Sequence, residues 1–220
     1  MCASAGALAV PPHAVVSPVS AIVAGFVGLF GLRVWRWSHL PSSMQTESPH
    51  GVARLIRPAA WTGLGLVVGL LLLGVIRLVI EPAVPGAGAR IAAAAELPVW
   101  RRMVIVYVAA VSEELLFRLL LLSLFTGLAT RLARRAGRVP NRRIVWVANG
   151  LSAFAFAAAH LPAWRAVDSM NPGLALMVLT LNGLAGVILG YLFVKRGISA
   201  AMWAHAGADC AIQLIGPLTG

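Results

Sequence analysis

Three ionisable residues, Glu113, Glu114 and Arg118, lie inside the long apolar stretch of residues 103–126. The stretch is long enough to cross a bilayer, and a charged side chain near the bilayer centre costs roughly 2.5–3.5 kcal/mol on insertion scales. Three such groups together therefore predict a polar site lined by protein. The alternative that this stretch leaves open is a buried structural salt bridge with one protonated spectator acid.

Helical spacing separates the roles of the two glutamates. Glu114 and Arg118 are four residues apart with the acid first, which is the favourable orientation for an ion pair on a helix. Glu113 lies about 100° round the helix from Glu114. It need not share that pair, so we expect its carboxylate to be available for chemistry.

Two later stretches add histidines and a third acid within apolar runs. His160 ends FAFAAAHLP, one helical turn after Phe156, and MWAHAGADCA places His205 and Asp209 on one helix face. A lone membrane histidine is more often a hydrogen bond between helices than a catalyst. Two histidines and three acids on intramembrane faces instead favour one shared aqueous pocket, and such groups are functional candidates.

These groups suit three kinds of chemistry, and no Ser or Cys nucleophile accompanies them in a convincing setting. In the first, a carboxylate and a histidine activate water, while the remaining His and Asp polarise the scissile carbonyl or stabilise its oxyanion. Asp209 can donate a hydrogen bond only when protonated; otherwise it orients His205. In the second, Glu113, His160 and His205 hold zinc with an open water position, although no HExxH is present. The third is a proton or ion relay.

The composition indicates which elements position these residues. Of the 220 residues, 60% are hydrophobic and 11% are charged, whereas soluble domains have about 25% charged residues. We therefore expect an all-α, polytopic transmembrane helix bundle with a polar intramembrane active site. The candidate spans, each near the length that a bilayer requires, are about 15–34, 60–80, 103–126, 143–162, 172–194 and 198–215.

The formal charge of +11 is not the signature of a nucleic-acid groove. The basic residues cluster in short segments between apolar runs, which is typical of residues that set membrane topology. The positive-inside rule places residues 33–58, residues 127–143 and the Lys195–Arg196 turn on the cytoplasmic side, with both termini outside. Arg90 then lies in an outer connection, where residues 87–97 could form a re-entrant or interfacial helix.

Small and polar residues inside the spans carry further expectations. Gly65 with Gly69 and Gly186 with Gly190 form GxxxG pairs, which allow close helix packing in membranes. Asn149 and Asn182 are additional intramembrane amides.

Rise along the helices gives one geometric conflict. At about 1.5 Å per residue, Glu113 lies roughly 17 Å past Arg102, whereas His160 lies roughly 26 Å past Arg143. A shared site therefore requires the fourth span to start later or to tilt.

Three motifs on successive spans carry a family resemblance. They are EELLFR (Glu113 to Arg118), FAAAH (Phe156 to His160) and HAGAD (His205 to Asp209). Together with the run GVILGYLFVKRGISAAMWAH, they resemble the CPBP family, the membrane proteases related to type II CAAX prenyl endopeptidases and to bacteriocin-immunity proteins. The resemblance covers about residues 100–215. It suggests a division into N-terminal spans and loops (1–99) and a protease core (100–220).

The resemblance implies a role for each site residue. Glu113 and His160 would activate water, His205 and Asp209 would act on the oxyanion side, and Glu114, Arg118 and Phe156 would support them. Asp209 departs from the Asn that is usual in the prenyl endopeptidases. Bacterial members are often called metalloproteases, whereas the CAAX enzymes resemble metal-independent Glu/His hydrolases, so zinc stays open.

The expected activity is hydrolysis of a peptide bond in a membrane-associated protein or peptide. Prenylation of that substrate is an association of the family, and no nucleic-acid partner is expected. The expected location is a multi-pass position in a bacterial inner (cytoplasmic) membrane. Two alternatives are a non-catalytic immunity or peptide-binding member of the family and a small proton-coupled transporter, although no inverted repeat supports the latter.

Overall fold

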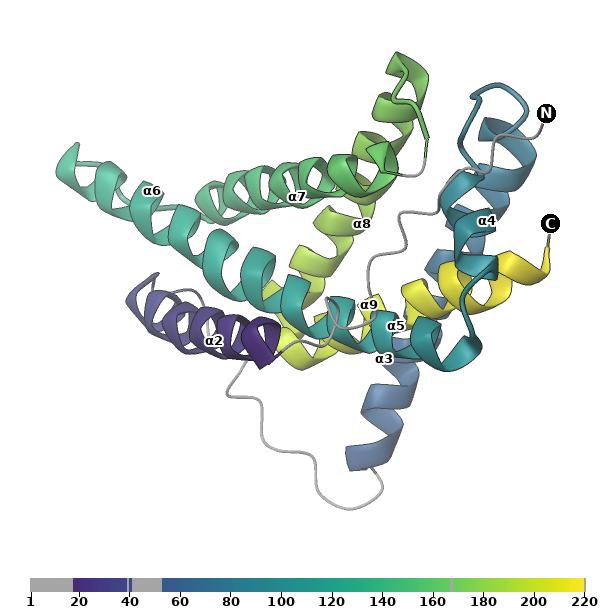
Figure 1. Cartoon of the computed structure of the whole chain (residues 1–220). Coiled ribbons are helices and arrows are strands. Elements are labelled where there is room, and N and C mark those ends of the chain that lie inside the picture. Colours follow the sequence, from purple (N-terminus) through teal and green to yellow (C-terminus); the bar gives the residue numbers. More distant parts are fainter. Residues whose placement is uncertain (1–17, 39, 41–52, 167, 220) are drawn as a thin grey trace, which may run out of the picture.

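The computed structural model describes residues 18–38, 40, 53–166 and 168–219 of this chain, and these residues contain no strand. The all-α expectation is confirmed (Figure 1). The elements are α2 (Pro18–Ser38), α3 (Ala53–Val75), η2 (Ile76–Ile80), α4 (Ala89–Ala95), α5 (Val99–Glu114), η3 (Leu115–Leu122), α6 (Ser123–Arg135), α7 (Arg142–Arg165), α8 (Pro172–Arg196), α9 (Ile198–Cys210), η4 (Ala211–Ile215) and η5 (Gly216–Leu218).

Among the described residues, three helical stretches are long and apolar enough to cross a membrane. They are Ile56–Ile80, Arg142–Arg165 and Pro172–Arg196, which correspond to the second, fourth and fifth expected spans. The other expected spans also lie on helices, but this measure does not confirm a total of six. Residues 15–17 of the first expected span lie outside the described residues. The chain is thus an integral membrane protein with at least these candidate spans.

The third expected span is the central part of a longer helical rod. Elements α5, η3 and α6 follow one another without a break from Val99 to Arg135. The middle element η3 is a π-helix that starts directly after Glu114. π-Helical segments inside α-helices frequently occur at functional sites. The wider turn thus follows immediately after the two glutamates.

Both GxxxG pairs lie at close helix contacts, as predicted, and both contacts position a motif helix. A Cβ on Gly69 of α3 would lie 2.5 Å from the carbonyl oxygen of Ala208 on α9. A Cβ on Gly186 of α8 would lie 2.9 Å from the Cβ of Ala153 on α7. Only glycine allows backbones to approach this closely. As a result α3 supports the helix of His205 and Asp209, and α8 supports the helix of His160 (Figure 1).

Replacement of Gly65 by valine should separate α3 from α9. The new Cβ would overlap the backbone carbonyl of Ala204, next to His205, and backbone cannot move aside as a flexible side chain can. Overpacking of this kind costs about 1–3 kcal/mol. We expect a lower unfolding temperature in detergent together with loss of activity. Gly63→Val is the matched control, because a Cβ on Gly63 meets no atom of the described residues within 4 Å. Equal effects of the two substitutions would contradict this packing.

Helix α8 has a clear start and end, and a single residue, Gly197, separates it from α9. Asn171 caps α8 by accepting a hydrogen bond from the Leu174 amide at 2.9 Å, and Pro172 occupies the first turn, where it is well tolerated. Gly197 ends α8 with a φ of 90°, which favours glycine. Helix α9 starts at the next residue, so it turns back directly into the bundle with His205.

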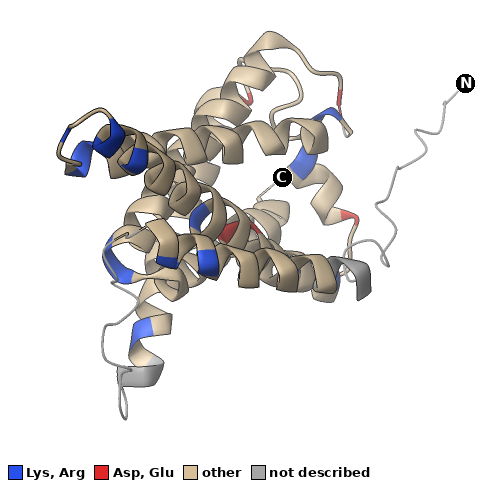
Figure 2. Cartoon of the chain, turned by 90° about the vertical axis from the view of Figure 1, so that its left-hand side faces the viewer, with Lys and Arg blue, Asp and Glu red and all other residues tan. Residues whose placement is uncertain are grey.

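Charge is distributed unevenly over the described chain. Figure 2 shows most Lys and Arg residues toward the left of the view, and the acids, apart from those in the middle, toward the right. The positive-inside rule infers the orientation of a membrane protein from such an asymmetry. Which of these loops face the cytoplasm stays a prediction. Glu47 and residues 1–17 lie outside the described residues. The expected short helix near residues 87–97 forms as α4, at Ala89–Ala95.

Candidate active site

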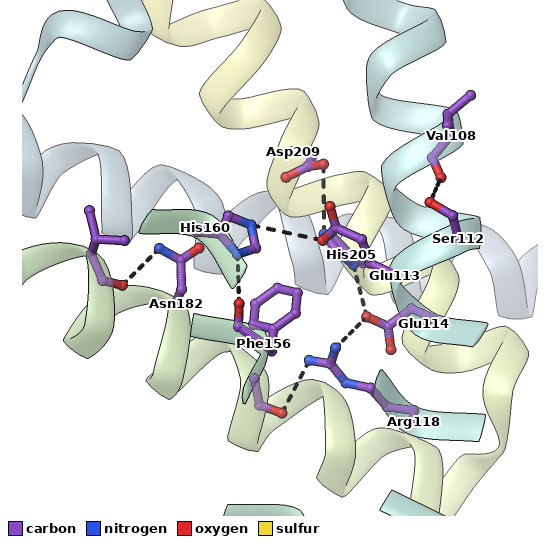
Figure 3. A network of polar contacts seen from close by, with 12 residues as sticks. Val108, Ser112, Glu113, Glu114, Arg118, Phe156, His160, Asn182, His205 and Asp209 are labelled. Carbon is purple, nitrogen blue, oxygen red and sulfur yellow. Dashed lines mark hydrogen bonds and ion pairs between the residues drawn. The ribbon is translucent and has the colours of Figure 1, made fainter. Parts of the chain in front are cut away.

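Side chains from two helices, α7 and α9, converge on the carboxylate of Glu113 on α5 (Figure 3). Its Oε2 lies 3.8 Å from Nε2 of His160 on α7 and 3.8 Å from Nε2 of His205 on α9. Oε2 is buried and has no hydrogen-bond partner among the described residues. These separations exceed direct hydrogen bonds, and a polar contact of this length is where a bridging water is expected. Glu113 is free of the Arg118 pair, as the spacing predicts.

The imidazole of His160 is oriented by its own helix. Its Nδ1 lies 2.8 Å from the backbone carbonyl oxygen of Phe156. Since a carbonyl can only accept, Nδ1 carries the proton and donates it. The other nitrogen, Nε2, then presents its lone pair toward Glu113 in the neutral ring.

The expected distance conflict does not keep His160 from the shared site. Helix α7 starts at Arg142, and Nε2 of its His160 lies 3.8 Å from Glu113 Oε2. A tilt of α7 and a cytoplasmic extension that holds Arg142 and Arg143 are both compatible with this contact.

His205 is oriented by a buried pair that the sequence predicted and by a contact that it did not. Arg118 Nη1 lies 3.2 Å from Glu114 Oε1, the expected i,i+4 ion pair, and both side chains are almost completely buried. The same Oε1 lies 2.8 Å from Nδ1 of His205. Arg118 is in turn anchored through Nη2, which donates to the Gly186 carbonyl at 3.3 Å. The chain of contacts fixes the ring so that Nε2 faces the site.

Asp209 lies one turn after His205 on the same face, as predicted. Its Oδ2 is 3.7 Å from Nε2 of His205, so two carboxylates, those of Asp209 and Glu113, flank this nitrogen. An imidazole with a carboxylate near each nitrogen can hold both protons, and its Nε2–H is then a donor directed into the site.

The ring of Phe156 packs against these polar groups. Its ring centroid lies 4.7 Å from that of His160 and 5.8 Å from that of His205. The guanidinium of Arg118 lies 4.4 Å from the same centroid, within cation–π range. Phe156 therefore contacts both histidines and the cation that supports one of them, which gives a physical reason for its place in the FAAAH motif.

A cavity of about 300 Å³ contains Glu113, His160, His205 and Asp209. This volume is at the lower end of ligand pockets, which are roughly 300–1,000 Å³. Most of the wall is apolar. The remaining polar lining residues are Arg90, Asn182 and Gln213.

The structure gives places to two other polar residues, Arg90 and Asn149, that the sequence did not predict. Arg90 was expected in an outer connection, and only the fold brings it to the cavity, because no motif surrounds it. Asn149 has a packing role, since its amide donates to the Val187 carbonyl at 3.1 Å across the α7–α8 contact.

The residues proposed to hold zinc are Glu113, His160 and His205, and their arrangement can be compared with that of a zinc site. Zinc holds nitrogen and oxygen ligands at about 2.0–2.2 Å and needs them directed at one point. In the described part of the chain, no group of three His, Cys, Asp or Glu residues has an arrangement that could hold a metal ion. In this arrangement Glu113, His160 and His205 are therefore not a formed metal site, and the zinc expectation stays a prediction.

Comparison with protein families finds a match. The sequence model of a family described as type II CAAX prenyl endopeptidase Rce1-like matches residues 95–211, which include all three motifs. No curated protein and no solved structure matches the chain.

Proposed function

This chain belongs to the Rce1-like family of type II CAAX prenyl endopeptidases, and on that premise we propose that it hydrolyses a peptide bond of a membrane-associated protein or peptide with water activated by Glu113 and His160. The observation that carries the proposal is the convergence of Glu113, His160 and His205 within one cavity. The membrane would be a bacterial inner membrane. A prenyl group on the substrate is a family association.

Water activation is assigned to Glu113, whose Oε2 has no hydrogen-bond partner among the described residues, and to His160, whose Nε2 has a free lone pair. A water between Glu113 Oε2 and His160 Nε2 gives up a proton to the carboxylate as its oxygen bonds to the scissile carbonyl carbon. The C–N bond then breaks, and the same proton passes from Glu113 to the leaving amine. The products are a new carboxyl end and a new amino end, so the atoms balance.

Oxyanion stabilisation is assigned to His205. Its Nε2–H would donate to the carbonyl oxygen as negative charge develops, while Nδ1 stays bonded to Glu114. Asp209 would orient the ring and favour the proton on Nε2. A pre-oriented donor of this kind requires no reorganisation during the reaction.

The proposal is tested by reconstituting the protein in liposomes with a library of membrane peptides and identifying products by mass spectrometry. Hydrolysis predicts products that depend on Glu113. A peptide-binding or immunity role predicts bound but intact peptides and tolerance of Glu113→Gln, which keeps the shape and removes the charge. A proton-coupled transporter predicts a function that depends on a gradient and survives without any cleavage.

Chelation should leave the activity unchanged. On the metal-independent mechanism that we propose, neither 1,10-phenanthroline nor EDTA is expected to lower the initial cleavage rate. A matched sample with added zinc controls for slow metal loss. Inactivation by chelator with recovery on zinc addition would contradict the metal-independent mechanism and favour a rearranged His2Glu site.

A further inference from the structure

One cation lines the cavity without a hydrogen-bond partner among the described residues. Arg90, on α4, faces the same cavity as Glu113 and Asp209. Its guanidinium carbon lies 5.8 Å from the ring centroid of Trp164. Trp164 is on α7, one turn after His160. Arg90 makes no ion pair or hydrogen bond with any residue that the structure describes. Its five N–H donors are therefore available to a ligand.

Arg90 itself attracts an anionic ligand, and the neighbouring carboxylates of Asp209 and Glu113 favour one of low charge. Burial lowers the pKa of its guanidinium, and the carboxylates of Asp209 and Glu113 act in the opposite direction. A half-buried cation without an acceptor is unfavourable, and a bidentate carboxylate relieves this. A phosphate, with more charge than a carboxylate, would be repelled more strongly by Asp209 and Glu113.

The position of Arg90 sets it apart from the three motifs. The family match starts at residue 95, so Arg90 lies outside the matched segment. It nevertheless shares one cavity of about 300 Å³ with the reacting groups. A peptide whose end is held at Arg90 can therefore place only a bond close to that end beside Glu113.

We propose that Arg90 binds the C-terminal carboxylate of the substrate and so restricts cleavage to a bond near the end of the chain. The position of cleavage rests on the proposed hydrolysis, whereas binding of the carboxylate to Arg90 does not depend on it. The two planar oxygens would accept from the guanidinium fork, with Trp164 holding the guanidinium plane. Arg90 is thus a positioning residue that determines which end of a peptide enters the site.

The test separates binding from cleavage. A pool of apolar tetrapeptides with free C-terminal carboxylates, and the same pool as C-terminal carboxamides, is equilibrated with the Glu113→Gln protein in detergent, and retained peptide is quantified by mass spectrometry. We expect the acids to be retained more strongly than the amides. Adding Arg90→Gln should weaken acid binding about ten- to a hundredfold, as for a charge-assisted hydrogen bond, and leave amide binding unchanged.

Two further variants make the result specific. Arg90→Lys keeps the charge but loses the fork, so it should retain part of the preference for acids. Arg101→Gln removes an equal charge from a guanidinium that packs on Trp100 and does not line the cavity, so the preference should persist.

Two results would overturn the role of Arg90, whatever happens to cleavage: equal retention of acids and amides by Glu113→Gln, or acid binding that Arg90→Gln leaves unchanged. Conversely, Arg90-dependent acid binding without any cleavage in the wild type would support the anchor and count against the proposed hydrolysis. The first comparison needs no Arg90 variant, so it holds even if Arg90→Gln folds poorly.

Discussion

Glu113→Gln is expected to lower kcat for peptide cleavage by about 10²–10⁴-fold, the usual contribution of a general base. Glutamine keeps the size of the side chain but cannot take a proton from water. Peptide binding should be retained, because the substitution breaks no contact that holds the fold together. Oε2 of Glu113 lies 3.8 Å from each histidine and has no hydrogen-bond partner among the described residues. Steady-state kinetics on one cleaved peptide measure the effect.

Glu96→Gln is the matched control for this substitution. Glu96 is exposed at the end of α4 and does not line the cavity, so the same chemical change there should leave kcat unaltered. A Glu113→Gln protein with the kcat of the wild type would remove Glu113 from the role of base. An equal loss in both variants would indicate a general effect of the lost charge.

Arg118→Met should be among the most destabilising single substitutions in the described chain. It leaves the carboxylate of Glu114, which is completely buried, without its cation. Breaking a buried pair by removing one partner costs about 3–5 kcal/mol. We expect a marked fall in the thermal unfolding temperature in detergent, together with loss of cleavage, because Glu114 also orients His205.

The double variant Glu114→Leu/Arg118→Met separates stability from catalysis. Apolar replacement of both partners of a buried pair is often neutral for stability. The double variant should therefore recover much of the unfolding temperature lost by Arg118→Met. It should stay inactive, because Nδ1 of His205 loses its acceptor. Recovery of activity along with stability would show that the pair acts only as a structural support.

The sequence predicted the helices and the pairings within each helix. Spacing four residues apart gave the Glu114–Arg118 ion pair and put Asp209 on the face of His205, and both arrangements are present. The GxxxG pairs predicted close helix contacts, which occur at α3–α9 and α7–α8. Such regularities follow from the local geometry of one helix or from residue size, so they can be predicted without knowing the fold.

Contacts between helices were less predictable. The hydrogen bond from His205 to Glu114 joins residues 91 positions apart, and nothing in either motif indicates it. The distance conflict at His160 arose because rise was counted along each helix from its own basic end, and this does not give the position of one helix relative to another. The π-helix lies in LLFRLLLL, where the run of leucines gives no sign of a wider turn. Arg90 stands in a short alanine-rich segment without a motif.

The most direct test of the central claim is cleavage of the membrane-peptide library in water enriched in ¹⁸O, with wild-type and Glu113→Gln proteins prepared in parallel. Water activated at Glu113 predicts wild-type products that carry one ¹⁸O atom in each newly formed carboxyl end, and labelled products from Glu113→Gln that form about 10²–10⁴-fold more slowly. Labelled products in equal amounts from both proteins would contradict the account.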